Sequence, residues 1–198
     1  MMEARKRILE KVVSAHSAGS DIETACLPVG YVYPFESASK GHVSILGKKG
    51  TFEDCHQTIR QVMQICRKDS CSFGNVYQPD LIAHGQTDRI YGFSFFFDRI
   101  EPLIHSDRVK VSQVKDLAEK MCFLEMHDIP SSRDSEKLTQ NPFYCLELTY
   151  IYALWKEGYK IPEDRDVILA KKIKSFETGW ALGETIKLME KVSSQCNH

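Results

Sequence analysis

The stretch FETGWALGETIKLMEK, residues Phe176–Lys191, is an unusual beginning for a helix. Its second half, with Val192 directly after it, carries an apolar face made of Ile186, Leu188, Met189 and Val192. Its first half places the large Trp180 between two glycines, Gly179 and Gly183. Each glycine in a helix costs roughly 1 kcal/mol relative to alanine. A sequence tolerates that cost where another part of the molecule must approach the backbone closely. The stretch therefore predicts a close contact along this turn.

The composition describes a globular chain and excludes several kinds of partner. The chain has 198 residues, 42% hydrophobic and 27% charged, which is enough for one domain of ordinary size. Its formal net charge is −1, so nothing predicts attraction to nucleic acid or to an anionic membrane. The apolar runs are far shorter than the ~20 residues of a membrane span. The N-terminus, MMEARKRILEK, is charged from its third residue and does not read as a signal peptide.

Helical spacing predicts four helices ahead of the glycine-rich stretch. The first covers Glu3–His16. The second begins after Thr51, which reads as an N-cap because Asp54 follows three residues later. A third is predicted to be capped by Ser112. The fourth, Phe143–Glu157, is apolar nearly all round and should be a central buried helix that stops at the glycine after it.

Strand signals lie between these helices. His42–Leu46 and Leu169–Ile173 read as strands, whereas Ser17–Glu23 reads as a polar loop. The aromatic segment Arg89–Phe97 fits either a strand or the start of a buried helix. Since strands and helices alternate without a clear linker, the sequence predicts one α/β domain.

Familiar catalytic motifs do not occur in this sequence. There is no Gly-x₄-Gly-Lys-Ser/Thr or Gly-x-Gly-x-x-Gly phosphate loop and no His-Glu-x-x-His. Cys55 and His56 are adjacent, but neighbouring residues of a helix point in different directions. The pattern therefore predicts a buried cysteine and a surface histidine, not a nucleophile with its base.

Seven cysteines leave alternatives open. In a cytosolic protein they would be buried thiols or metal ligands, and in a secreted protein they would mostly be paired. Cys66 and Cys71 stand at the wide end of the spacing seen in zinc sites, but no second close pair accompanies them. An odd count leaves at least one free thiol, for which Cys196 is the natural candidate.

The segment GWALG resembles the last signature motif of the apyrase-like nucleoside phosphatases, which include the ecto-nucleoside triphosphate diphosphohydrolases and the Golgi nucleoside diphosphatases. Further segments are similar to family motifs in the same order, so the resemblance spans essentially the whole chain. They are ACLPVGY (25–31), TFEDCHQTI (51–59), CSFGNVYQP (71–79), YGFSFFFDRI (91–100) and FYCLELTYIYALWKEGY (143–159). The similarity is greatest to the soluble endomembrane diphosphatase branch.

The resemblance implies a fold. It is an α/β fold, part of an actin/hexokinase-like (ribonuclease H-like) two-lobed architecture. Residues 1–175 would form the later part of the second, base-binding lobe, and residues 176–198 the final helix returning to the first. The family's phosphate loops of Asp-x-Gly-Ser type and its catalytic Glu do not occur in this sequence, which leads us to expect a truncated form. Gly179, Trp180 and Gly183 would support the site from the final helix, although Trp180 could equally be only a core anchor.

The resemblance also implies a chemistry. The family hydrolyses nucleoside diphosphates and triphosphates, and the similarity favours a UDP/GDP-type diphosphatase. Mg²⁺ or Ca²⁺ would bind through the substrate and the part of the enzyme not present here, with no catalytic or metal-binding residue in this chain. Phe97 and Tyr144 would sandwich the nucleobase, and Ser94 would add a polar contact; the alternative is that both aromatic residues are core residues in apolar segments. An inert form that binds nucleotide or a full-length partner without turnover is the alternative.

The family pattern further implies a pairing of the cysteines and a compartment. The expected disulfides are Cys26–Cys55, Cys66–Cys71 and Cys122–Cys145, which would leave Cys196 free. Such pairing requires the oxidising lumen of the endoplasmic reticulum or Golgi, or the cell exterior.

Overall fold

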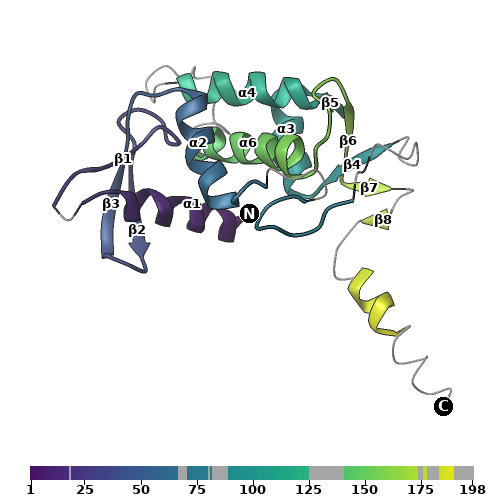
Figure 1. The fold of residues 1–198 in the computed structure, drawn as a ribbon. Coiled ribbons are helices and arrows are strands. Elements are labelled where there is room, and N and C mark those ends of the chain that lie inside the picture. Colours follow the sequence, from purple (N-terminus) through teal and green to yellow (C-terminus); the bar gives the residue numbers. More distant parts are fainter. Residues whose placement is uncertain are drawn as a thin grey trace, which may run out of the picture.

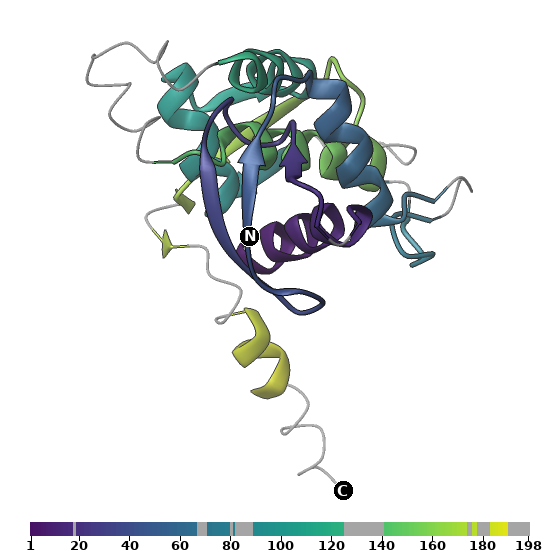
Figure 2. The same ribbon diagram turned by 90° about the vertical axis from the view of Figure 1, so that its left-hand side faces the viewer.

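The computed structural model of the chain describes residues 1–17, 19–66, 71–79, 81, 89–124, 141–173, 176–177 and 183–189. A group of helices lies between two small sheets, as Figure 1 shows; Figure 2 views the molecule from the side on which the first sheet lies. The helical residues 183–189 lie apart from this body in both views. Among the described helices, none has the length and apolar character needed to cross a membrane.

The first sheet packs beside the N-terminal helix. Helix α1 (Met2–Ala15) agrees with the predicted helix and buries four apolar residues, Ile8, Leu9, Val12 and Val13. The strands β1 (Ile22–Thr24), β2 (Val32–Ser37) and β3 (Gly41–Gly47) form a sheet in the order β1-β3-β2. β1 is parallel to β3, and β2 is antiparallel to it. The prediction of a loop through Glu23 was wrong, because the buried Ile22 pairs with Ile45 of β3.

Helix α2 (Phe52–Met63) begins with the predicted cap. The Thr51 hydroxyl accepts a hydrogen bond from the Asp54 amide at 3.3 Å, and the Asp54 carboxylate accepts one from the Thr51 amide at 2.8 Å. The helix ends at Gln64, whose backbone is left-handed.

Helix α6 (Tyr144–Ala153) is the centre of the structure. All of its residues except Tyr150 are buried, as its apolar sequence predicts, and it packs against α2, α3 and α4. It does not continue to Glu157 as an α-helix, however. It widens into the π-helix η1 (Leu154–Gly158), in which the Tyr159 amide bonds to the Leu154 carbonyl five residues back.

The second sheet contains β4 (Ile90–Phe93), β6 (Asp166–Ala170) and β5 (Arg108–Lys110) in that order. β6 is parallel to β4 and antiparallel to β5. The predicted strand Leu169–Ile173 lies too far along the chain, because paired strands on both sides hold Asp166–Ala170 and bury Val167. The short strands β7 (Lys172–Ile173) and β8 (Phe176–Glu177) form an antiparallel pair beyond it.

The aromatic segment that fitted either a strand or a helix contains both. β4 ends at Phe93, and α3 (Phe95–Ile104) begins two residues later. The single residue between them, Ser94, has φ = 51° and ψ = −114°, a backbone conformation that side-chain-bearing residues rarely adopt. Helix α4 (Val111–Phe123) begins one residue before the predicted cap, Ser112, because the Gln113 side chain accepts a hydrogen bond from the Lys110 amide at 2.8 Å.

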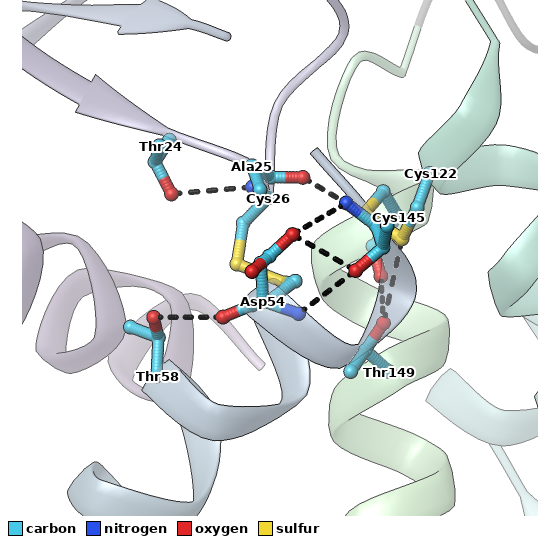
Figure 3. Close-up of a disulfide and its surroundings, with 10 residues drawn as sticks. Thr24, Ala25, Cys26, Asp54, Thr58, Cys122, Cys145 and Thr149 are labelled. Atoms are coloured by element: carbon cyan, nitrogen blue, oxygen red, sulfur yellow. Dashed lines mark hydrogen bonds between the residues drawn. A yellow bond between two sulfur atoms is a disulfide. The ribbon is translucent and has the colours of Figure 1, made fainter. Parts of the chain in front are cut away.

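The structure contains the three disulfides that the family resemblance implies. The Cα–Cα distances are 4.9 Å for Cys26–Cys55, 5.9 Å for Cys66–Cys71 and 4.6 Å for Cys122–Cys145. Figure 3 shows the first and third of these close together, with the Sγ atom of Cys145 3.4 Å from the Ala25 carbonyl oxygen. Cys122–Cys145 joins α4 to the first turn of α6. Cys196 lies outside the described residues.

The disulfides lead to a prediction about stability. Along the sequence, Cys122 and Cys145 are 23 residues apart, and Cys66 and Cys71 are 5 residues apart. Replacing both cysteines of the longer loop by serine should lower the free energy of unfolding by about 3 kcal/mol, and of the shorter loop by about 2 kcal/mol, in the chain-entropy model. Urea unfolding of protein made in an oxidising compartment measures both losses. Non-reducing peptide mapping that recovers all seven cysteines as thiols would contradict the pairing.

The backbone of Ser94 leads to a second prediction. Ser94→Gly should raise the free energy of unfolding by about 1 kcal/mol, because glycine adopts this conformation without the strain that a side chain causes. Thermal unfolding measures the gain. Ser112→Gly is the matched control, since it places glycine inside α4 and should instead cost about 0.5 kcal/mol. If both variants lose stability alike, Ser94 is not strained.

Candidate functional site

Ser94 lies at an edge of the second sheet where ligands commonly bind. β4 and β6 run parallel and end side by side at Phe93 and Ala170. Open α/β sheets bind ligands beyond the carboxyl ends of such strands. Ser94 follows β4 directly, its side chain is exposed, and its hydroxyl makes no capping hydrogen bond to α3. The residue proposed for a polar nucleotide contact is therefore at this edge, with its hydroxyl open to solvent.

Phe97 lies in the first turn of α3, at the same edge. Its ring is partly buried, and the Nζ atom of Lys171 lies 5.0 Å from the ring centroid. Lys171 comes directly after β6, and the same Nζ atom is 3.8 Å from the Asp98 carboxylate. An aromatic ring, a cation and a carboxylate thus meet where β4 and β6 end. A cation this close to an aromatic face is attracted to it.

Tyr144 is the first residue of α6, and only 7% of its surface is exposed. Burial raises the pKa of its phenol above the ordinary value of 10.0, the nearby Arg99 guanidinium lowers it, and the Glu147 carboxylate raises it further. The phenol is therefore neutral at physiological pH. Helices α3 and α6 pack against each other, but Phe97 and Tyr144 are not among the ring pairs in contact within the described chain. The structure places the two predicted aromatics on neighbouring helices with their rings apart.

A buried ion network joins these two helices, and sequence reasoning missed it. The Glu147 side chain is fully buried in α6. Its Oε2 atom accepts hydrogen bonds from Arg99 Nε at 2.5 Å and from Asn141 Nδ2 at 2.9 Å, and its Oε1 atom pairs with Arg5 of α1. The available signal was a single glutamate within an otherwise apolar helix, because a buried carboxylate requires partners.

His56 is buried, so the prediction of a surface histidine was wrong. Its ring stacks on Phe52 with 5.1 Å between ring centroids, and its Nε2 atom lies 2.5 Å from a carboxylate oxygen of Glu157. Arg60 Nε contacts the other oxygen of that carboxylate at 2.9 Å. The adjacent Cys55 is buried as predicted, in its disulfide. This cluster ties α2 to η1 and lies on other elements than Ser94 and Phe97.

The glycine-rich stretch is only partly described. Gly179 and Trp180 lie outside the described residues. Gly183 is helical, and a Cβ atom at that position would meet nothing within 4 Å. The role of these three residues in supporting a site stays a prediction.

A concave surface lies at the opposite end of the same strands. A cavity of about 580 Å³ is lined by three arginines, Arg89, Arg108 and Arg165, and also by Asp164 and Asp166. Arg89 precedes β4 and Asp166 begins β6, so the cavity opens at the amino ends of these strands. It is therefore separate from the edge that carries Ser94 and Phe97. No group of three His, Cys, Asp or Glu side chains that could hold a metal ion occurs in the described ranges.

Comparison with known proteins identifies the family. The family model for GDA1/CD39 (nucleoside phosphatase) matches residues 1–197. Similar curated proteins include the guanosine-diphosphatase of Candida albicans, which is 29% identical in an alignment 203 positions long that covers 94% of this chain and 34% of that protein. The probable guanosine-diphosphatase of Aspergillus fumigatus is 34% identical over 79% of this chain and 33% of its own length.

An animal protein is also similar to most of this chain. The ectonucleoside triphosphate diphosphohydrolase 5 of Bos taurus is 30% identical over 94% of this chain and 40% of that protein. The chain thus spans between a third and two fifths of the length of these three relatives. Because the family model covers nearly every residue, the chain belongs to the GDA1/CD39 nucleoside phosphatase family.

Proposed function

We propose that this chain is the base-binding portion of an enzyme that releases phosphate from nucleoside diphosphates or triphosphates. The observation that carries the proposal is the family match over residues 1–197. UDP and GDP are the favoured substrates, a preference supported by relatives named guanosine-diphosphatase. We further propose that residues 1–175 belong to the second lobe of an actin/hexokinase-like fold, with residues 176–198 returning to the first lobe.

Phe97 and Tyr144, here named the base clamp, would hold the nucleobase between their rings, with Ser94 as a polar contact. The position of Ser94 and Phe97 at the carboxyl ends of β4 and β6 supports this assignment. Stacking suits an enzyme that accepts several bases, because every base has a π-face.

Groups outside this sequence would supply the chemistry on the phosphates. The sequence contains no Asp-x-Gly-Ser loop. We therefore propose that Mg²⁺ or Ca²⁺ binds through the substrate and through residues that this sequence does not include. The three disulfides support an oxidising compartment, the endoplasmic reticulum or Golgi lumen or the cell exterior.

The 198-residue chain alone should not hydrolyse nucleotides. Positioning and charge stabilisation of the phosphates supply nearly all the acceleration of phosphoryl transfer, and the base clamp supplies neither. The measurement is phosphate release from UDP, GDP and ATP with Mg²⁺ or Ca²⁺. Metal-dependent turnover by the pure chain at an ordinary enzymatic rate would contradict this prediction. The alternative hypothesis is a form that binds nucleotide without turnover. It also requires that the chain bind nucleotide and release no phosphate.

The base clamp is tested in a complete enzyme, made by joining this chain to the phosphate-binding half of a relative. Tyr144→Ala should raise KM about tenfold for every nucleotide, because one stacked base contributes roughly 1–3 kcal/mol and ~1.4 kcal/mol is a factor of ten. Hydrolysis of tripolyphosphate, which has no base, should be nearly unchanged.

Tyr152→Ala is the matched control for this variant. Tyr152 lies on the same helix, is 6% exposed, and donates a hydrogen bond to Glu163 at 2.7 Å. Its loss should lower stability without separating nucleotide from tripolyphosphate. If Tyr144→Ala leaves nucleotide KM unaltered, or impairs both substrates equally, Tyr144 serves packing and not recognition.

A further inference from the structure

The carboxylate of Glu147 is held from three directions inside the structure. Arg99 and Asn141 bond to one oxygen, and Arg5 pairs with the other. Both arginines are themselves fixed by aromatic rings, since the Arg5 guanidinium lies 3.9 Å from the Phe143 ring centroid and that of Arg99 lies 5.3 Å from a second ring. A buried charge with this many fixed partners is rigid, because any displacement would leave it unpaired in a medium of low dielectric constant.

The network spans the two helices that carry the base clamp. Phe97 and Arg99 are two residues apart on α3, whereas Tyr144 and Glu147 are three residues apart, within one turn, on α6. The hydrogen bond of 2.5 Å between Arg99 and Glu147 therefore crosses from one helix to the other within a turn of each clamp residue. The third element, α1, contributes Arg5 but no clamp residue.

We infer that Glu147 is a positioning residue that fixes how α3 and α6, and with them Phe97 and Tyr144, lie relative to each other. This inference rests on the proposed function. A clamp whose two sides are already held in place loses less conformational freedom on binding, and it therefore binds more tightly. The carboxylate does not touch the base and acts only through Arg99 and the helices.

Two arginine variants separate positioning from stability. Arg99→Gln and Arg5→Gln each remove one cationic partner of the same carboxylate, and the two side chains are similarly exposed, at 29% and 22%. Only Arg99 lies on a helix of the clamp. The measurement is the GDP affinity of the 198-residue chain by NMR titration. Affinity should fall about tenfold for Arg99→Gln, because that is the contribution of one stacked base to binding. It should fall at most about threefold for Arg5→Gln.

Urea unfolding and two simpler ligands complete the design. Both arginine variants should lose comparable stability, because each leaves Glu147 with one arginine fewer. Guanosine, which has no phosphate, should show the same ranking as GDP. Pyrophosphate, which has no base, should bind neither the wild type nor a variant, because the phosphate loops do not occur in this sequence. Glu157→Gln is the control for general destabilisation, since it breaks a paired carboxylate that joins α2 to η1. It should leave GDP affinity within about twofold of the wild type.

The outcomes are distinguishable. Suppose that the wild-type chain binds GDP and guanosine. If affinity then falls equally in the two arginine variants, or falls in proportion to the lost stability in all three variants, the positioning role is overturned and the base clamp remains. A wild-type chain that binds neither GDP nor guanosine would overturn the clamp itself, and with it the role of Glu147. If Arg99→Gln does not fold, Arg99→Lys, which keeps the charge but not the planar guanidinium, takes its place with the same expected ranking.

Discussion

The packing of the helices depends most on the buried carboxylate of Glu147 in α6 and on the side chains that pair with it. Removing a carboxylate from water costs several kcal/mol even after the protein relaxes, and that cost is recovered only with well-placed partners. Glu147 has these partners, two arginines and an asparagine contributed by three separate parts of the chain. A packing of α1 or α3 that moved its arginine away from α6 would leave an uncompensated charge, at a cost of about 3–5 kcal/mol. The network therefore restricts how these helices can be arranged.

Helix α6 is held on two opposite sides by different kinds of bond. Residues two positions apart on a helix point roughly 200° apart, so Cys145 and Glu147 face in nearly opposite directions. Cys145 is bonded covalently to α4, while Glu147 is bonded ionically to α1 and α3. The Thr149 hydroxyl donates a hydrogen bond to the Cys145 carbonyl at 2.7 Å, on the side of the disulfide. The covalent and ionic connections thus share one helix without competing for the same surface.

Local patterns in the sequence were sufficient where the structure is local. The apolar spacing of α1 and the Thr51–Asp54 cap depend on residues within a turn of each other, and both were predicted. The two arginine partners of Glu147 lie 142 and 48 residues away along the chain, so no spacing rule could identify them. The burial of His56 was missed for the same reason, since Glu157 is brought to it by the fold.

The candidate site divides in a similar way. Family motifs identified Ser94, Phe97 and Tyr144, but they gave no indication that the backbone of Ser94 has a positive φ or that Lys171 lies over the Phe97 ring. Both features depend on where β4 and β6 end relative to each other, which is a property of the sheet. The sequence therefore identifies the candidate residues, and the fold determines which side chains surround them at the carboxyl ends of β4 and β6.

The π-helix at the end of α6 constrains how related sequences can vary. A π-turn closes with a hydrogen bond five residues back, so it contains one residue more than an α-turn, and it occurs mostly as a single turn within an α-helix. In η1 the widened turn packs closely, because a Cβ atom at Gly158 would come within 3.1 Å of the Phe73 ring. Deleting one residue here would restore the α-helical period and rotate each later residue by about 100°. Glu157 would then no longer face His56. Among relatives, a one-residue gap at this turn and the loss of the His–Glu pair should occur together, as one evolutionary event and not two.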